Sequence, residues 1–232
     1  SVRLEHDLVE PAGGNAGALD STAGFGSFGE DCDGNPAPAG TACGRFRWDD
    51  VGIISLLPGI GDADYLGAGD VAASLLARVG RFIPARLGVS VNTPEFADAC
   101  TGGGFTYLGE PFGFETDPVF TVQGLNLQGN VTANYDAAFW RLATTLAGRT
   151  YVNNAAGTAA TVGVDTLGSV TEGGIGAPPF AGPRTYALGA ETLAYVKPAT
   201  PEAPFDARVH LDLAAADLTD ADGVCHDPDQ NG

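Results

Sequence analysis

The sequence predicts an all-β protein made of tandem immunoglobulin-like β-sandwich domains. Apolar and polar residues alternate along several short segments, which is the period of a half-buried strand. The 232 residues include 34 Gly and 15 Pro, and these residue types indicate many turns between short elements. No apolar pattern supports a helix longer than a few turns. Many short strands separated by turn residues favour a sandwich over alternating strands and helices.

The alternation is clearest at residues 2–8, 87–91 and 205–213. In the last of these segments His210 falls among the polar residues, so we expect it on the exposed face of a strand. A short helix is predicted over Asp70–Arg78. Further strands are predicted at Arg45–Trp48, Val51–Leu57, Val79–Ile83, Phe112–Glu115, Val119–Leu125, Ala138–Leu142 and Tyr186–Leu188.

Pro84 marks the expected domain boundary. It removes a backbone donor and restricts Ile83 to extended conformations, as a linker between domains would. We expect a first β-sandwich domain at residues 1–84 and a second at residues 85–232, the latter ending in an acidic loop. The chain begins within a strand pattern and stops within a turn pattern, so we interpret it as a segment of a longer protein.

The charge of the chain excludes several classes of function. Its net charge is −18, with 29 acidic and 11 basic residues, and Lys197 is the only lysine. Such a surface repels nucleic-acid phosphates and anionic membranes. No apolar run is long enough to span a bilayer, and no signal peptide is present. The acidity favours solubility and supplies oxygen ligands for a hard cation.

Four cysteines are present, Cys32, Cys43, Cys100 and Cys225, and they allow three disulfide connectivities. Cys32 and Cys43 bracket a loop rich in Gly, Pro and Asp that has little else to hold it, so we expect a bridge there. A bridge between Cys100 and Cys225 then follows by elimination. Disulfides predict an oxidising, extracellular compartment, and the absence of a CxxC motif makes zinc a poor fit.

Two acidic clusters are candidate calcium sites. In the tail, aspartates and glycines alternate as in loops that wrap calcium in carboxylate and carbonyl oxygens. In the second cluster, glycines between the aspartates would let backbone carbonyls turn inward. An ordinary solvated β-turn is the alternative for both. The predicted ligands are Asp217, Asp220, Asp222, Asp227 and Asp229 in the tail, and Asp62, Asp64 and Asp70 in the second cluster.

The sequence carries no recognised catalytic motif. GxSxG, HExxH and Walker A patterns are all absent, and acidic pairs mean little in a chain with 29 carboxylates. We therefore expect a protein that is not an enzyme, with a secreted hydrolase as a remote alternative. A sugar-stacking platform could be formed by the aromatic residues Trp48, Trp140, Phe139, Tyr107, Phe112 and Phe114. For Trp48 and Trp140 a place in a sandwich core is the better expectation.

Six separated blocks, kept in order, resemble a known family. The blocks are Phe46–Ile54, Asp64–Val71, Val79–Pro84, Phe96–Cys100, Phe105–Phe112, and Lys197–Ala207 followed by Asp222–Val224. Together they resemble the conserved region of unknown function in MshQ-like proteins, which are associated with MSHA-type (type IV) pili and with large LamG-bearing surface proteins. The resemblance implies an extracellular, adhesin-like protein, and it transfers no catalytic residue.

The sequence therefore leads to two main hypotheses. The first is a structural or adhesive module of a bacterial surface or pilus-associated protein, with other pilus or surface domains, glycans or solid surfaces as partners. The second is a calcium-dependent carbohydrate-binding module.

Overall fold

The structure is a computed structural model that describes residues 2–25, 38, 41, 43–71, 73–98 and 104–226. Over these residues the protein is all-β, as predicted, with 15 strands and two short 3-10 helices. The strands form six small sheets, of which the largest has four strands. This topology does not establish tandem immunoglobulin-like sandwiches, which stay a prediction. Within the described ranges no helix is long and apolar enough to cross a membrane.

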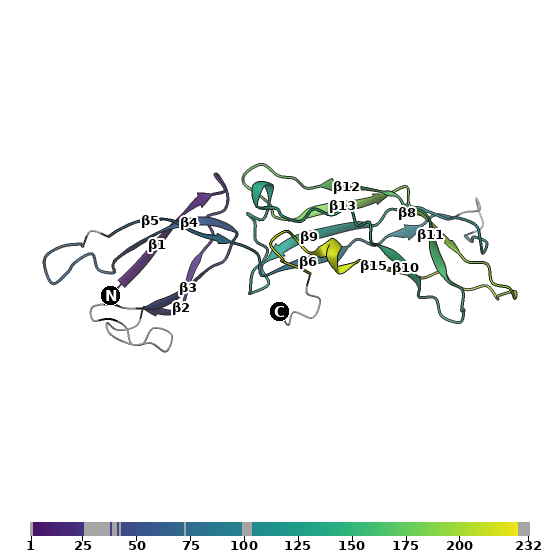
Figure 1. Cartoon of the computed structure of the whole chain (residues 1–232), viewed down its shortest axis with the longest axis horizontal. Coiled ribbons are helices and arrows are strands. Elements are labelled where there is room, and N and C mark those ends of the chain that lie inside the picture. Colours follow the sequence, from purple (N-terminus) through teal and green to yellow (C-terminus); the bar gives the residue numbers. More distant parts are fainter. Residues whose placement is uncertain are drawn as a thin grey trace. The chain divides into compact units, whose positions relative to one another are not determined.

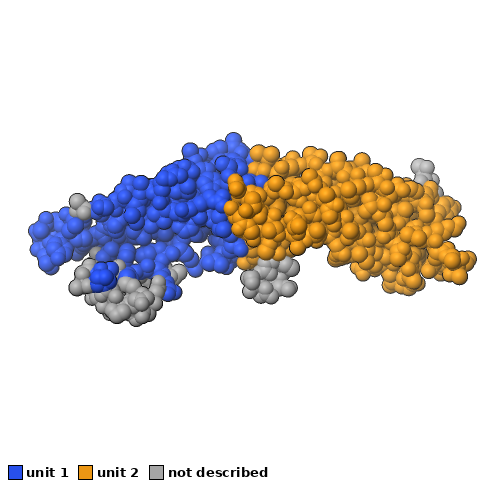
Figure 2. Space-filling view, viewed as in Figure 1, with its two compact units in different colours: residues 1–85, 124–140, 176–182 blue, residues 86–123, 141–175, 183–232 orange. Residues whose placement is uncertain are grey.

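The chain divides into two compact units (Figure 2). Unit 1 comprises residues 1–85, 124–140 and 176–182, and unit 2 comprises residues 86–123, 141–175 and 183–232. The first change of unit follows Ala85, directly after Pro84. Both units are discontinuous in sequence, because the chain returns twice to unit 1.

Unit 1 contains a three-stranded antiparallel sheet and a separate strand pair. In the sheet, β4 (Gly52–Ile60) lies between β1 (Val2–Glu10) and β5 (Leu76–Phe82). The pairing places Leu8 opposite Ile54 and Ile54 opposite Val79. The strand pair consists of β2 (Leu19–Phe25) and β3 (Gly44–Trp48).

The core of unit 1 is aromatic. The Trp48 ring meets the edge of Phe82 at 5.3 Å between centroids, and the Tyr135 and Trp140 rings lie 4.7 Å apart. Both tryptophans are buried, as predicted. Because Trp and Tyr bury large apolar surfaces, these rings form a substantial part of the core together with Val51 and Ile54, which are also buried.

A buried polar network also joins three segments of unit 1. Asp50 accepts hydrogen bonds from the backbone N–H groups of Val51 (2.8 Å) and Asn134 (3.0 Å) and from Asn15 Nδ2 (2.9 Å). Asn15 and Asn134 are further joined by two bonds between side chain and backbone, of 2.7 and 2.8 Å. Burial raises the pKa of Asp50 above its usual 3.8, and the hydrogen bonds offset only part of that rise.

Unit 2 is built around the four-stranded sheet, whose strands lie side by side in the order β12-β13-β9-β6 (Figure 1). These strands are β12 (Ser169–Gly173), β13 (Arg184–Gly189), β9 (Val119–Leu125) and β6 (Arg86–Val91). The remaining strands form three pairs: β10 (Thr150–Asn153) with β15 (Val209–Asp212), β11 (Val162–Thr166) with β14 (Thr192–Tyr195), and β7 (Glu95–Phe96) with β8 (Phe114–Thr116).

The three strand pairs share one hydrophobic core. Phe112, Tyr151, Ala160, Leu193 and Tyr195 are its buried members, and they pack against partly buried residues that include Phe96, Phe205 and Leu211. Along β15 the burial alternates, with His210 exposed, as the sequence predicted.

An ion pair is buried in unit 2 beside this core. The Arg149 and Glu191 side chains are 1% and 0% exposed, and Arg149 Nη2 lies 2.6 Å from a Glu191 carboxylate oxygen. Burial by itself lowers the pKa of Arg149, but the hydrogen bonds and charge of Glu191 outweigh it, so the net pKa is raised. Burial, followed by the Glu191 carboxylate, also raises the pKa of the Tyr151 phenol.

Two predicted elements are wrong. Ala138–Leu142 is not a strand, because η1 (Ala137–Phe139) begins there, capped by the Asp136 side chain. Phe139 and Trp140 are adjacent and both buried, which a strand with one wet face does not allow. Asp70–Arg78 is not a helix, because its last residues belong to β5 and pair with β4. Val71 and Leu75 are exposed, so no apolar helix face is buried.

Candidate ligand-binding cavity

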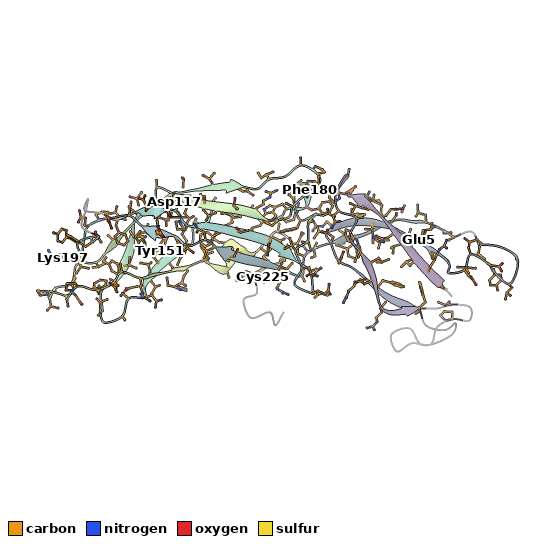
Figure 3. All side chains as sticks on the ribbon, turned by 180° about the vertical axis from the view of Figure 1, so that it is seen from behind. Glu5, Asp117, Tyr151, Phe180, Lys197 and Cys225 are labelled. Carbon is orange, nitrogen blue, oxygen red and sulfur yellow. The ribbon has the colours of Figure 1, made fainter. Side chains whose placement is uncertain are left out.

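Unit 2 contains a cavity of about 1060 Å³ between two segments of irregular backbone. One wall is formed by residues 104–108, and the other by residues 197–207, which follow β14. Backbone hydrogen bonds join the chain next to these walls, since Gly109 N donates to Tyr195 O at 2.8 Å and Phe112 and Leu193 exchange two bonds of 2.8 Å. The walls of the cavity are therefore anchored to the hydrophobic core of unit 2, to which Phe112, Leu193 and Tyr195 belong. Lys197, in one wall, lies at one end of unit 2 (Figure 3).

The floor of the cavity is part of the hydrophobic core. Phe112 stacks on Tyr195 with 5.9 Å between ring centroids, and Phe205 meets Tyr195 edge-on at 5.2 Å. The Tyr195 hydroxyl lies 3.2 Å from Asn153 Oδ1 and 3.1 Å from Arg208 O. Burial raises the pKa of Tyr195, and the contact with the Arg208 carbonyl offsets part of that rise. The phenol is therefore a fixed, neutral part of the floor.

The rim presents aromatic side chains to solvent. Phe105 is 49% exposed and Tyr107 is 62% exposed, and their rings meet edge-on at 5.4 Å with 82° between their planes. Exposed rings beside a cavity cost hydrophobic free energy in the free protein, and they are common where a ligand covers them.

The charged groups of the cavity are mainly acidic. Asp98, Glu202 and Asp206 line it together with Lys197. Glu202 accepts a hydrogen bond of 3.2 Å from the Thr158 hydroxyl. In the wall between the two exposed rings, the hydroxyl oxygen of Thr106 is buried and has no hydrogen-bond partner within the described part of the chain.

The opposite wall is stiffened by proline. Pro198, Pro201 and Pro204 recur at every third residue and line the cavity. Because each proline fixes its own φ and restricts the preceding residue, this wall loses little conformational entropy when a ligand binds.

The described part of the acidic tail shows structural roles for its aspartates. Asp220 Oδ1 accepts from the N–H groups of Asp222 (2.8 Å) and Val224 (2.9 Å), which closes a turn. Asp217 accepts from Gly148 N at 3.0 Å and from the Thr144 hydroxyl at 3.2 Å. Asp222 Oδ2 lies 4.0 Å from Arg141 Nε. The other two predicted tail ligands, Asp227 and Asp229, lie outside the described residues.

The second predicted calcium cluster is open and exposed. Asp64 accepts from Gly69 N at 3.0 Å, while Asp70 accepts from Val71 N at 2.9 Å and lies 3.8 Å from Arg3. Asp62 is exposed. Across the described residues no group of three or more His, Cys, Asp or Glu side chains is placed to hold a metal ion. Calcium binding stays a prediction, because Asp227 and Asp229 of the tail lie outside the described residues.

The cysteine prediction is wrong in one part. Cys225 is an exposed free thiol, so it does not form the expected bridge with Cys100. Cys43 is disulfide-bonded, but Cys32 and Cys100 both lie outside the described residues, and the pairing of Cys32 with Cys43 stays a prediction. Cys225 lies well away from Lys197 in unit 2 (Figure 3), so the thiol is not part of the cavity.

The fold and the cavity define a class: an all-β protein with an aromatic, acidic cavity at the end of a strand-built unit. The chain belongs to the DUF6701 family, since the family's third domain matches residues 50–232. No curated protein and no solved structure matches the chain. The family match covers all of unit 2 and the whole cavity, whereas β1, β2 and β3 precede it.

The sequence identifies Tyr107 and Phe112 as aromatic residues that could bind a sugar, but it does not predict that they lie near residues 197–207. A signal was present, because the blocks Phe105–Phe112 and Lys197–Ala207 both stand out by their aromatic and proline content. Their proximity depends on the pairing of Phe112 with Leu193, which is a long-range contact that periodicity does not reveal.

Proposed function

We propose that this chain is a non-catalytic adhesive module of a bacterial surface protein, and that its adhesive contact is the aromatic cavity of unit 2. The observation that carries the proposal is the pair of exposed rings, Phe105 and Tyr107, above a buried aromatic floor. Concave, largely apolar sites with a few polar groups are the usual form of a small-ligand site.

The composition of the cavity favours binding over chemistry. Its described lining is largely aromatic and apolar, with a few charged groups, which is the usual composition of a binding pocket. The buried phenol of Tyr195 is held by Asn153 and Arg208 and serves the fold. The disulfide at Cys43 supports an exported, extracellular location, and the resemblance to MshQ-like proteins supports a pilus or surface assembly with other surface domains as partners.

Adhesion of the intact chain tests this proposal. Beads that display the chain would be scored for attachment to glycan-coated, protein-coated and mineral surfaces. The double variant Phe105→Ala/Tyr107→Ala is expected to lose most of the attachment. Tyr65→Ala is the control, because Tyr65 is a comparably exposed aromatic residue of unit 1 (57%). Equal attachment by both variants and the parent chain would refute an adhesive role of the cavity.

Carbohydrate binding is the second candidate function, and the exposed Tyr107 ring favours it, because such a ring can stack on a sugar face. The test is a glycan array probed with and without chelator. Loss of glycan binding in EDTA would support the calcium-dependent form, and binding that persists in EDTA would leave a calcium-independent module.

A further inference from the structure

We propose that the cavity of unit 2 recognises its ligand through an organic ammonium group, held between aromatic ring faces and carboxylates. The inference rests on the proposed function in placing the adhesive contact at this cavity, and it adds the chemical class of the ligand. It is carried by the charge of the lining and by the geometry of the exposed rings.

The charge of the lining selects a cation. Three carboxylates, Asp98, Glu202 and Asp206, face the same cavity as one ammonium, that of Lys197. No ion pair between Lys197 and these carboxylates is found within the described residues. The chain as a whole carries a net charge of −18. Because fields add over a concave surface, this lining attracts cations and repels anionic ligands.

The aromatic geometry favours an organic cation over a metal ion. The Phe105 and Tyr107 rings meet edge-on with 82° between their planes, so each ring keeps at least one face that the other ring does not cover. A cation within about 6 Å of an aromatic ring centroid is attracted by the ring quadrupole, and this attraction is used to recognise quaternary ammonium ligands. The described residues lack a group of three carboxylates placed to bind a metal ion, so the carboxylates act here as long-range charge.

Choline is the probe, and 3,3-dimethylbutan-1-ol is its neutral isostere. Both would be titrated into the intact chain by calorimetry or by NMR. Choline is expected to bind at least about tenfold more tightly than the neutral compound, because the two differ only in charge. The preference should shrink as salt is raised, since the carboxylates of Asp98 and Asp206 are exposed to solvent.

Matched variants locate the binding. Tyr107→Ala is expected to weaken choline binding by about five- to tenfold, and Asp98→Asn/Asp206→Asn by about the same factor. The controls are Tyr65→Ala and Asp7→Asn/Asp20→Asn, which remove one exposed ring and two exposed carboxylates from unit 1. These controls are expected to bind choline as the parent chain does. All of these residues are exposed, and a melting curve of each variant confirms that it is folded.

Several results would overturn the proposal. Equal binding of choline and its isostere excludes charge recognition, and equal losses in the cavity variants and controls exclude the cavity. Binding of a neutral oligosaccharide such as cellotetraose, unaffected by Asp98→Asn/Asp206→Asn, would replace the ammonium class with neutral sugar. Absence of choline binding together with Tyr107-dependent adhesion refutes only the ligand class, whereas adhesion independent of Tyr107 refutes the proposed function.

Discussion

Removal of the Glu191 carboxylate is expected to be among the most destabilising single changes in unit 2. Arg149 Nε lies 3.0 and 2.9 Å from the two Glu191 oxygens, and its Nη2 lies 2.6 Å from one of them. Nη1 also donates to Leu146 O at 2.9 Å, and Nη2 donates to Gly168 O at 2.7 Å. The Arg149 side chain is 1% exposed, so its charge is closed to water and depends on Glu191 for compensation.

The expected magnitude follows from this burial. Glu191→Gln keeps the shape of the side chain but leaves the buried guanidinium without a counter-charge, which costs about 3–5 kcal/mol in the free energy of unfolding. Glu172→Gln is the matched control in the same unit. Glu172 pairs with Arg184 at 2.6 Å but is 37% exposed, so its loss is expected to cost about 1 kcal/mol.

Urea denaturation followed by fluorescence and circular dichroism gives both values as shifts of the midpoint at constant slope. The double variant Arg149→Met/Glu191→Leu removes both charges and should cost less than the sum of Arg149→Met and Glu191→Leu alone. Strict additivity, or a Glu191→Gln cost no larger than that of Glu172→Gln, would refute the argument that Arg149 depends on its partner.

The remaining predictions concern unit 1, the thiol and the tail. The folded pKa of Asp50 is raised above 3.8, so the folded state binds the proton more tightly than the unfolded chain does. The free energy of unfolding of unit 1 is therefore expected to fall as the pH rises from 3.8 through the folded pKa of Asp50. Asp50→Asn should abolish this pH-dependent part of the unfolding free energy, and a parallel pH profile in the parent and the variant would contradict it. Gly52→Ala should destabilise unit 1 by at least about 2 kcal/mol in urea melts, because Gly52 has φ +143° and a Cβ there would collide with the Glu10 carbonyl oxygen. Cys225 should react with iodoacetamide in the native chain, whereas Cys43 should react only after reduction, as peptide mass spectrometry would show; a protected Cys225 would disprove its free state. Calcium binding by the tail predicts a melting temperature that falls in EDTA, and an unchanged one rejects calcium as a structural cofactor.

The positions of many strands could be predicted from the sequence, because the alternation of apolar and polar residues along a strand follows the burial of its side chains. β9 (Val119–Leu125) has the predicted bounds, and β3, β4 and β6 lie within a few residues of theirs. The strands that were missed, such as β11 and β14, are short and mix Gly, Ala and Thr with few large apolar residues. Their burial depends on partners distant in sequence, which periodicity does not report.

The candidate sites were harder to predict from the sequence, because they too depend on contacts between residues distant in sequence. The tail aspartates look like calcium ligands in sequence, because Asp-rich turns and calcium loops use the same residue types. In the structure Asp220 Oδ1 closes a turn on the N–H groups of Asp222 and Val224. Whether the same turn also collects enough oxygen ligands for a cation depends on the folded positions of all five predicted ligands, which residue types alone do not give.

Stability and ligand binding should be separable in this cavity, because two kinds of aromatic residue line it. Phe112 and Tyr195 are 4% and 2% exposed and belong to the core of unit 2, so their replacement by alanine would cost about 3–5 kcal/mol of stability. Loss of binding in such variants would then say nothing about the ligand. Tyr107 is 62% exposed, and its removal leaves the core intact. A binding defect in Tyr107→Ala at unchanged melting temperature therefore assigns the ring to the ligand. The same defect with a lowered melting temperature would place Tyr107 in the core and remove the main support for an adhesive cavity.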